Sequence, residues 1–471
     1  MTKYKDTYFK KINEYETQLL TDLESLMKIN SVRDINTKCS YAPFGKGIRR
    51  TFDQMIYFSK RDTFFYEDFD GYAMHIVMGK GKEEIGILGH LDIVHEGEQN
   101  EWMFPPFSLS KDENYLYGRG VNDDKGPVIA AYYALRIIRD LNFPLKRKVK
   151  LILGGAEETT WECMEHYFKI NNQPTMAFSP DGDFPIVNGE KGIVKGNFVS
   201  NASHNVNEKD SDYSHKLLYI DSVKQWNFVC KNIKVQFYSK CPQNLKRNLT
   251  EAKKVLIKNN FVTAFYEGTN ILSRNPHKGN NILFNFIEDL SKIEQDIDLF
   301  ATNFFKIVND YFCNDVYGSK IGLYTVDKEM GHTTLCLTYV LFNSKEFEIG
   351  FDYRYPKGIT KHKVLETMEI FSKDNNIVLE IKDSKELLYV NPESKLIQGL
   401  SKGYKNITGE TAYCLTKGGA SYARVLDKGV AFGPSFRQDL PNSHKPNEKL
   451  RISTLKYAIA IYCESIRILA T

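Results

Sequence analysis

The stretch GPVIAAYYALRIIRDLNFPLKRKVKLIL, residues 126–153, decides the fold. Residues 126–141 predict a helix with Pro127 in its first turn, where a missing N–H costs little. Residues 149–153 form an apolar run of strand length that ends at two glycines. A helix and a strand therefore follow one another through a short link.

Two more apolar runs, 72–78 and 85–91, precede this helix and predict strands. The glycine-containing turn at 79–82 lies between them, so we expect these two strands to pair as a hairpin. Strands that alternate with a helix over short links indicate an α/β fold with a mixed β-sheet flanked by helices.

The composition changes after residue 192. Residues 193–384 are rich in Asn and Lys and predict an α+β segment. From residue 385 onward the sequence again resembles residues 1–192 in character. We therefore expect a discontinuous main domain, residues 1–192 and 385–471, with an inserted domain at 193–384. Within the insert, the expected strands are 261–267, 335–342 and 346–353, and the expected helices are 282–293 and 362–371.

The overall composition excludes several functional classes. The chain has 471 residues and a formal net charge of +4, which gives no basis for binding nucleic acid or an anionic membrane. None of the eight cysteines forms a C-x-x-C pair, which in a chain this long is typical of buried thiols in a reducing compartment. No signal peptide is visible, and no apolar run reaches the ~20 residues of a membrane span. We expect a cytoplasmic protein.

The first candidate site residues lie at a strand end and at a helix start, where functional groups gather. His90 and Asp92 face the same side of a strand end, so the carboxylate can hold one ring N–H while the other ring nitrogen binds a cation. At the helix start, Asp124 is interpreted as an N-cap. Asp123 is interpreted as a carboxylate that bridges two cations ~3.5–4 Å apart.

Further candidates follow along the chain. Glu157 and Glu158 come after strand 149–153, and this pair would supply one metal ligand and one general base. Asp181 and the distant His444 complete the set. Taken singly, each motif has a simpler explanation, such as a charged loop, a turn aspartate or a surface histidine. Taken together, mixed carboxylate and imidazole groups suit Zn²⁺, Mn²⁺ or Co²⁺.

These motifs and their flanking residues resemble one family over nearly the whole chain. The sequence is similar to the co-catalytic metallopeptidases that include aminoacylases, carboxypeptidases and dipeptidases, and most of all to the PepV-type bacterial dipeptidases. The stretches that carry the resemblance are ILGHLDIVHEGEQNEWMFPPFSL (87–109), LYGRGVNDDKGPVIAAYYALRIIRDL (116–141), GGAEETTWECMEHYF (154–168), FSPDGDFPIVNGEKG (178–192), FDYRYP (351–356), KGGASYAR (417–424) and FGPSFRQDLPNSHKPNE (432–448).

The resemblance implies two divalent cations, Zn²⁺ first, with Mn²⁺ or Co²⁺ as alternatives. One cation would be bound by His90, Asp123 and Asp181. The other would be bound by Asp123, Glu158 and His444, so that Asp123 bridges the two.

The resemblance also implies the catalytic groups. Asp92 would orient His90, and Glu157 would be the general base that takes a proton from a metal-bridged water. The inserted domain would be the lid of this family, which is double-sized in the PepV type and implies a monomer. The implied substrate-binding residues are Arg354, Asn205, Gly418, Gly419 and Ser421.

The lid departs from the family at one position. Relatives carry Gly-Lys-Ala-Ala-His-Gly/Ala-Ser-x-Pro, whose histidine helps to stabilise the oxyanion. Here residues 268–276 read GTNILSRNP, and Leu272 takes the place of that histidine. Leucine cannot donate a hydrogen bond, and loss of one oxyanion donor commonly costs ~10²–10³ in rate. Arg274 or His277 could compensate.

We therefore expect a metal-dependent dipeptidase that hydrolyses small unblocked peptides and has no nucleic-acid or membrane partner. One alternative is a deacylase of N-acyl amino acids that uses the same metal site. Another is a weakly active homologue that binds metal and peptide, which Leu272 favours. The presence of every expected metal ligand together with Glu157 argues against this last alternative.

Overall fold

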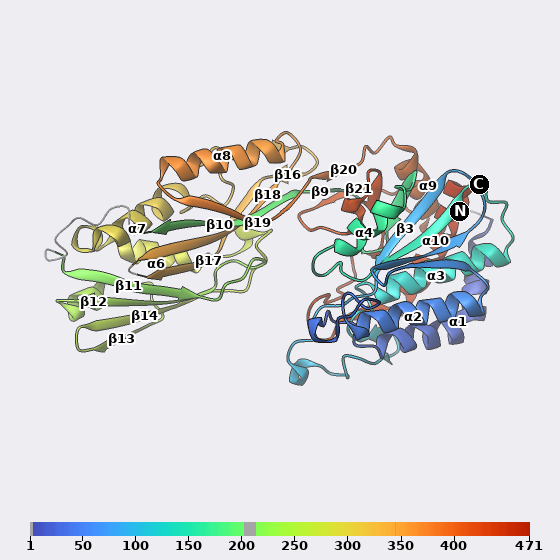
Figure 1. The fold of residues 1–471 in the computed structure, drawn as a ribbon, viewed down its shortest axis with the longest axis horizontal. Helices are drawn as coiled ribbons and strands as arrows, with labels where there is room; N and C mark the ends of the chain where they lie inside the picture. The colour runs from blue at the N-terminus through green and yellow to red at the C-terminus, as the bar shows by residue number, and fades with distance from the viewer. Residues whose placement is uncertain (1–2, 202–212, 344) are drawn as a thin grey trace. The chain divides into compact units, whose positions relative to one another are not determined.

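A computed structural model describes residues 3–201, 213–343 and 345–471 (Figure 1). The chain forms two compact units. The main unit comprises Met1–Gly189 and Leu388–Thr471, and the inserted unit comprises Glu190–Leu387. Each unit has a hydrophobic core of its own. The expected α/β main domain with an inserted α+β domain is confirmed.

The main unit is built on a nine-stranded mixed sheet in the order β1-β2-β6-β3-β7-β22-β9-β20, with β21 also paired to β9. β3 lies between β6 and β7 and runs parallel to both. β2 runs antiparallel to β6, and β22 runs parallel to β7. The strands are β1 (Phe65–Phe69), β2 (Ala73–Met78), β3 (Glu84–His90), β6 (Lys148–Gly154), β7 (Met176–Ser179), β9 (Ile186–Glu190), β20 (Leu388–Tyr389), β21 (Cys414–Lys417) and β22 (Gly429–Ala431).

Helix α3 is central to the main unit. Every residue from Lys125 to Ile138 is buried, including the charged Lys125 and Arg136. It packs against α1 and α10 and contacts β3, which places its N-terminus near the sheet. The helices of this unit are α1 (Lys5–Met27), α2 (Lys46–Arg61), α3 (Lys125–Asp140), α4 (Glu162–Ile170), α9 (Lys395–Thr408) and α10 (Ile452–Ala470).

The predicted hairpin of strands 72–78 and 85–91 is wrong. β6 lies between β2 and β3 and pairs with both, because its apolar run is buried enough to occupy the centre of the sheet. The connection at 79–82 therefore crosses the start of β6. Gly81 has φ +156°, and a Cβ there would lie 2.3 Å from the backbone oxygen of Lys146. Only glycine fits so close to another backbone.

Two small sheets connect the C-terminal part of the chain to loops of the main unit. β24 (Lys449–Arg451) pairs with β5 (Tyr115–Tyr117), which also pairs with β4 (Ser110–Lys111). β23 (Pro434–Ser435) pairs with β8 (Gly182–Asp183). Segments that are far apart in the sequence are therefore joined just before α3 and just after β7.

The inserted unit contains an eight-stranded sheet in the order β13-β14-β12-β11-β17-β18-β10-β19. All of its neighbouring strands run antiparallel, and among the described residues β11 pairs with β17 through Tyr219 and Ile220. The strands are β10 (Gly192–Asn201), β11 (His215–Ser222), β12 (Asn232–Ser239), β13 (Lys254–Lys258), β14 (Phe261–Glu267), β17 (Thr334–Asn343), β18 (Glu346–Tyr355) and β19 (Val378–Lys385).

The helices of the inserted unit lie against this sheet (Figure 1). The expected strand at 261–267 coincides with β14, and the other expected strands and helices fall on β17, β18, α6 and α8. Helix α7 was not predicted. The helices are α5 (Pro242–Asn248), α6 (Ile282–Ser291), α7 (Leu299–Tyr311) and α8 (Lys361–Asp374), and a short pair of strands is formed by β15 (Val326–Asp327) and β16 (Gly331–His332). Among the described residues, none of the helices has the length and hydropathy that crossing a bilayer requires.

Candidate metal centre

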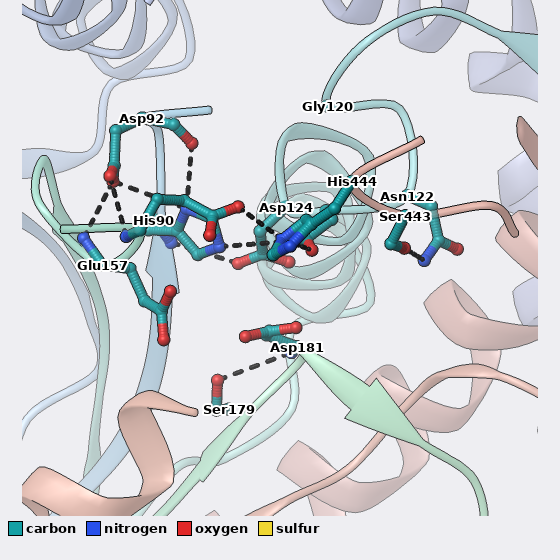
Figure 2. Close-up of polar contacts among 12 residues, drawn as sticks. His90, Asp92, Gly120, Asn122, Asp124, Glu157, Ser179, Asp181, Ser443 and His444 are labelled. Atoms are coloured by element: carbon teal, nitrogen blue, oxygen red, sulfur yellow. Dashed lines mark hydrogen bonds and ion pairs between the residues drawn. The ribbon is translucent and has the colours of Figure 1, made fainter. Parts of the chain in front are cut away.

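The candidate site lies at the carboxyl-terminal ends of neighbouring parallel strands in the main sheet. His90 is the last residue of β3, Glu157 and Glu158 follow β6, and Asp181 follows β7. These three strands are adjacent and parallel, so their carboxyl ends meet at the same edge. Figure 2 shows the side chains of His90, Glu157 and Asp181 turned toward a common centre.

Asp123 and His444 reach this edge from elsewhere in the chain. Asp123 stands just before α3, and His444 lies on the loop that precedes β24, with a left-handed φ of 63°. Asp123 has one carboxylate oxygen 3.1 Å from Nε2 of His90 and the other 3.0 Å from Nε2 of His444. Nε2 of His444 also lies 2.9 Å from Oε1 of Glu158. The two oxygens of Asp123 therefore face two different imidazoles.

Two groups of possible metal ligands share His90. His90, Asp123 and Glu158 have ligand atoms within 4.8 Å of one another, and so do His90, Glu157 and Asp181. The structure thus brings together all of the expected metal ligands and the expected base Glu157.

The charges of this cluster are unbalanced. Burial raises the pKa of the Glu157 carboxyl well above its usual value, and the neighbouring carboxylates of Glu158 and Asp181 raise it further, against the effect of His90. Burial and Asp123 raise the pKa of Asp181 to about 7. Both shifts have the same two causes, burial and the charge of neighbouring carboxylates.

The imidazoles respond in the opposite direction. Burial lowers the pKa of His444, but its contacts with Asp123 and Glu158 outweigh this effect and raise the pKa to about 11. Burial alone would raise the pKa of Asp123, yet His444 and His90 hold it well below its usual value. Asp123 therefore favours the protonated form of both His90 and His444.

The donor set fits divalent cations. Oε1 of Glu158 and Oδ1 of Asp124 are buried and accept no regular hydrogen bond from the described part of the chain. Oε1 of Glu158 nevertheless lies 2.9 Å from Nε2 of His444, so the two atoms would be placed to share one cation once the imidazole has lost its proton. Oxygen and imidazole donors that crowd together with excess negative charge suit Zn²⁺, Mn²⁺ or Co²⁺.

Asp92 acts differently from its expected role. Its carboxylate accepts the backbone N–H groups of Glu157 at 3.1 Å and Glu158 at 3.0 Å. Nδ1 of His90 lies 2.9 Å from the backbone oxygen of Asp92 and 3.4 Å from its carboxylate. Asp92 therefore orients His90 mainly through its backbone, and its side chain fixes the two glutamates.

Asp124 stands at the N-cap of α3, but its side chain makes no capping bond there. The capping prediction is wrong, because Oδ2 instead accepts the backbone N–H of His90 at 3.0 Å. Asp124 is fully buried. It ties the end of β3 to the start of α3.

The expected substrate-binding residues are distributed over both units. Gly418, Gly419 and Ser421 belong to the main unit, and the Ser421 hydroxyl accepts the backbone N–H of Ala423 at 3.3 Å. The next residue, Tyr422, packs edge-on against His90 with ring centroids 6.0 Å apart. This segment therefore borders the metal centre.

Arg354 belongs to the inserted unit, where Asp352 accepts two hydrogen bonds from its guanidinium, at 2.6 and 2.7 Å. Asp352 also accepts the hydroxyl of Ser273 at 2.5 Å. Leu272, beside Ser273, is 38% exposed and forms a bridge with Phe228. Asn205 lies outside the described residues.

Sequence reasoning missed Glu448, a fully buried carboxylate on the loop of His444 that binds the loop before Asp123. Its surroundings, PNSHKPNE, look like an ordinary polar loop. The only available signal was its place four residues after His444 within a stretch that carries the family resemblance.

Comparisons with known proteins agree with this geometry. The sequence pattern of peptidase family M20/M25/M40 matches residues 86–468. The chain belongs to this family. It is 32% identical over 460 residues to "Putative dipeptidase YtjP" of Bacillus subtilis, covering 96% of this chain and 97% of that one. It is 31% identical over 465 residues to the Staphylococcus haemolyticus relative SH1171, covering 97% and 98%.

Solved structures share the M20 fold at low sequence identity. The di-peptidase Dug1p of Saccharomyces cerevisiae has a TM-score of 0.61 at 13% identity, covering 100% of this chain and 99% of that one. Human carnosine dipeptidase 1 has a TM-score of 0.58 at 14% identity, covering 99% of each chain. The YXEP protein of Bacillus subtilis, described as a dinuclear metal-binding peptidase, has a TM-score of 0.51 at 12% identity, covering 97% and 99%. The protein is an M20 metallopeptidase whose donor set suits divalent metal.

Proposed function

We propose that this M20 peptidase is a dipeptidase that hydrolyses small unblocked peptides with two divalent cations, Zn²⁺ first and Mn²⁺ or Co²⁺ as alternatives. One observation carries the proposal: the two carboxylate oxygens of Asp123 face His90 and His444 separately, 3.1 and 3.0 Å away. A carboxylate placed in this way suits a bridge between two cations. The relatives with about one-third identity are named as dipeptidases, which supports the substrate class.

The remaining ligands divide between the two positions. His90, Asp123 and Asp181 would hold one cation, and Asp123, Glu158 and His444 the other. What supports the division is that His444 contacts Glu158, while Asp181 groups with His90. When bound, such cations lower the pKa of water and polarise the carbonyl of the scissile bond.

Glu157 would serve as the general base. Its backbone N–H is held by Asp92, and its carboxylate points into the cluster (Figure 2). Because burial and neighbouring carboxylates raise its pKa, the group holds a proton more readily than an ordinary glutamate does. It would accept a proton from the attacking water and return that proton to the amine leaving group.

Two further sets of residues would bind the substrate. We propose that Arg354 binds the substrate and that the segment of Gly418, Gly419 and Ser421 holds its carboxylate. The planar guanidinium of Arg354 suits carboxylate recognition, and Asp352 fixes its orientation through two hydrogen bonds. Asn205 is proposed as a further contact on the resemblance alone.

A panel of substrates tests the proposal. Metal-free protein should be inactive toward free dipeptides and should become active when Zn²⁺, Mn²⁺ or Co²⁺ is added. Turnover of N-acyl amino acids without turnover of dipeptides would replace the proposal with a deacylase. Peptide binding without turnover would support the weakly active homologue, which Leu272 favours because leucine offers no hydrogen-bond donor.

We further propose that the enzyme is a cytoplasmic monomer. All eight cysteines are free thiols, as is usual in a reducing compartment. The eight-stranded sheet of the inserted unit supports a lid that is complete within one chain. Light scattering should give the chain mass of 54.3 kDa, and cell fractionation should place the protein with cytoplasmic markers. A mass of twice this value or a membrane-bound fraction would contradict these proposals.

A further inference from the structure

Glu448 is a carboxylate enclosed by hydrogen-bond donors. Its side chain is fully buried. It accepts the backbone N–H groups of Gly120 at 3.2 Å, Asn122 at 2.9 Å and Asp123 at 3.1 Å. It also accepts a hydrogen bond from Nη1 of Arg119 at 2.6 Å. All these partners are donors, and such charge-assisted bonds are about twice as strong as neutral ones.

These bonds fix the loop that leads into Asp123. The loop contains Gly118 and Gly120, both with positive φ. Glycine has wide conformational freedom, so these residues do not by themselves restrict the loop to one conformation. The backbone oxygen of Glu448 accepts the N–H of Gly118 at 3.1 Å, while its carboxylate binds the other end of the loop. Successive N–H groups that surround one anion form a concave anion site, which here is filled by a side chain.

Glu448 also belongs to the loop that carries His444. This loop is closed by the bond from the N–H of Lys449 to the oxygen of Pro441, at 2.8 Å. Asn122 donates to the hydroxyl of Ser443 at 3.1 Å, which adds a second link between the two loops (Figure 2). The side chain of His444 is 52% exposed, so its position depends on its loop more than on packing.

Arg119 provides the counter-charge. Its side chain is 1% exposed, and its guanidinium lies over the ring of Trp102 at 5.2 Å. A buried ion pair of this kind is weak evidence of a contribution to stability, since two apolar residues often serve as well. A role in positioning explains why charge is placed here.

We propose that Glu448, with Arg119, is a positioning residue that sets Asp123 and His444 at the spacing needed to hold a cation between them. The inference rests on the proposed function and deepens it. Residues that orient metal ligands typically change metal affinity by about 10–100-fold when they are replaced. We expect metal affinity to fall by this factor at the cation site that His444 and Glu158 would form together.

The test compares Glu448→Gln and Glu448→Asp with Glu464→Gln in the full-length protein. Glu464 is also a fully buried glutamate paired with an arginine, Arg467 at 2.8 Å, but it lies on α10 and contacts none of the candidate ligands. Cobalt binding is followed by calorimetry and by the visible absorption of bound Co²⁺, and the melting temperature of the metal-free protein is recorded for each variant.

We expect Glu448→Gln to weaken one of two Co²⁺ sites by about 10–100-fold and to shift its absorption spectrum. Glu448→Asp keeps the charge beside Arg119 but withdraws the acceptor from Asn122 and Asp123, so it should fold and show the same defect. Glu464→Gln should lower the melting temperature while both Co²⁺ affinities and the spectrum stay as in the wild type.

Wild-type affinities and spectrum in Glu448→Asp, with only a lower melting temperature, would overturn the inference and leave Glu448 a purely structural residue. This outcome is distinct from failure of the proposed function, in which the wild-type protein itself would bind fewer than two Co²⁺ ions or fail to hydrolyse dipeptides.

Discussion

Nδ1 of His90 lies closer to the backbone oxygen of Asp92, at 2.9 Å, than to the carboxylate of that residue, at 3.4 Å. Because a carbonyl oxygen only accepts hydrogen bonds, Nδ1 must carry the proton. In the neutral imidazole, Nε2 is then left with its lone pair toward Asp123. The carboxylate of Asp92 is thereby available to hold the backbone of Glu157 and Glu158.

Asp92→Asn should therefore impair catalysis even though the backbone bond to His90 remains. An amide places one NH₂ group against the N–H of Glu157 or Glu158, so that one of these bonds is lost. We expect kcat to fall by about 10–100-fold. Steady-state kinetics should be compared with Asp53→Asn, which changes an aspartate on α2 whose side chain is 58% exposed. Equal kcat values in the two variants would contradict this role.

Metal binding should release protons. In the metal-free protein, contacts with Asp123 and Glu158 raise the pKa of His444 to about 11, so its imidazole is protonated at pH 7. The pKa of His90 is also raised by Asp123 and Asp92, against its burial. A cation must displace these protons, so affinity should weaken as the pH falls.

Calorimetry of Zn²⁺ binding at pH 7 in buffers of different ionisation enthalpy measures this release. We expect about one to two protons per chain, and fewer for His444→Asn. Binding heats that do not depend on the buffer would show that the two imidazoles are already neutral.

The stability of the main unit should depend on pH through His75. Burial and nearby Lys150 lower the pKa of this imidazole to about 4, against an ordinary value of 6.5. Between these values the unfolded chain binds more protons, so the stabilising contribution is complete above pH 6.5 and is lost as the pH falls toward 4. The loss amounts to up to about 3 kcal/mol.

His75→Gln removes this titration and keeps a polar partner for Tyr167, which lies 2.8 Å from Nδ1 of His75. Denaturant titrations of metal-free protein between pH 4 and 7 should show a shallower slope for the variant than for the wild type. Parallel slopes would mean that His75 titrates normally in the folded protein.

In the inserted unit, Ser273 should stabilise Asp352, the residue that hydrogen-bonds to Arg354. Its hydroxyl donates to Asp352, which is fully buried, at 2.5 Å. Hydrogen bonds to charged groups contribute about 1.5–3 kcal/mol, so Ser273→Ala should lower the free energy of unfolding of this unit by about that amount. Ser291→Ala, on the exposed end of α6, should change it by less than about 0.5 kcal/mol. Equal effects, measured by urea denaturation, would contradict the role of Ser273.

The part of the site that parallel strands place could be predicted from the sequence. His90, Glu158 and Asp181 follow apolar runs, and runs that pair in parallel end at one edge, so their meeting could be expected from strand order. His444 lies between β23 and β24, outside the main sheet, so strand order could not predict that it meets the other candidate ligands.

Other features depend on contacts between distant segments. The hairpin prediction failed because β6 is inserted between two strands that are neighbours in sequence. Asp124 has the sequence position of a cap, but a donor from β3 takes its carboxylate. Glu448 lies in a polar stretch, and its neighbours in the sequence do not indicate that its side chain is buried. Tertiary contacts decide each of these cases, and local patterns do not contain them.

Glu157 is proposed as the general base, whereas the residues beside it are proposed as metal ligands. Glu157→Gln removes a base but leaves His90, Asp123, Glu158, Asp181 and His444 unchanged. We expect the variant to retain two cations per chain and to lose about 10²–10⁴ in kcat for dipeptides. Glu162→Gln, a change in the same segment at a side chain that is 39% exposed, should leave both quantities unchanged.

The most direct measurement is therefore the cation content and the dipeptide turnover of Glu157→Gln, determined on the same protein sample. Two bound cations without turnover are the predicted result. Turnover close to that of the wild type, or the loss of a cation together with activity, would contradict the account, because Glu157 would then be dispensable or would itself be a ligand.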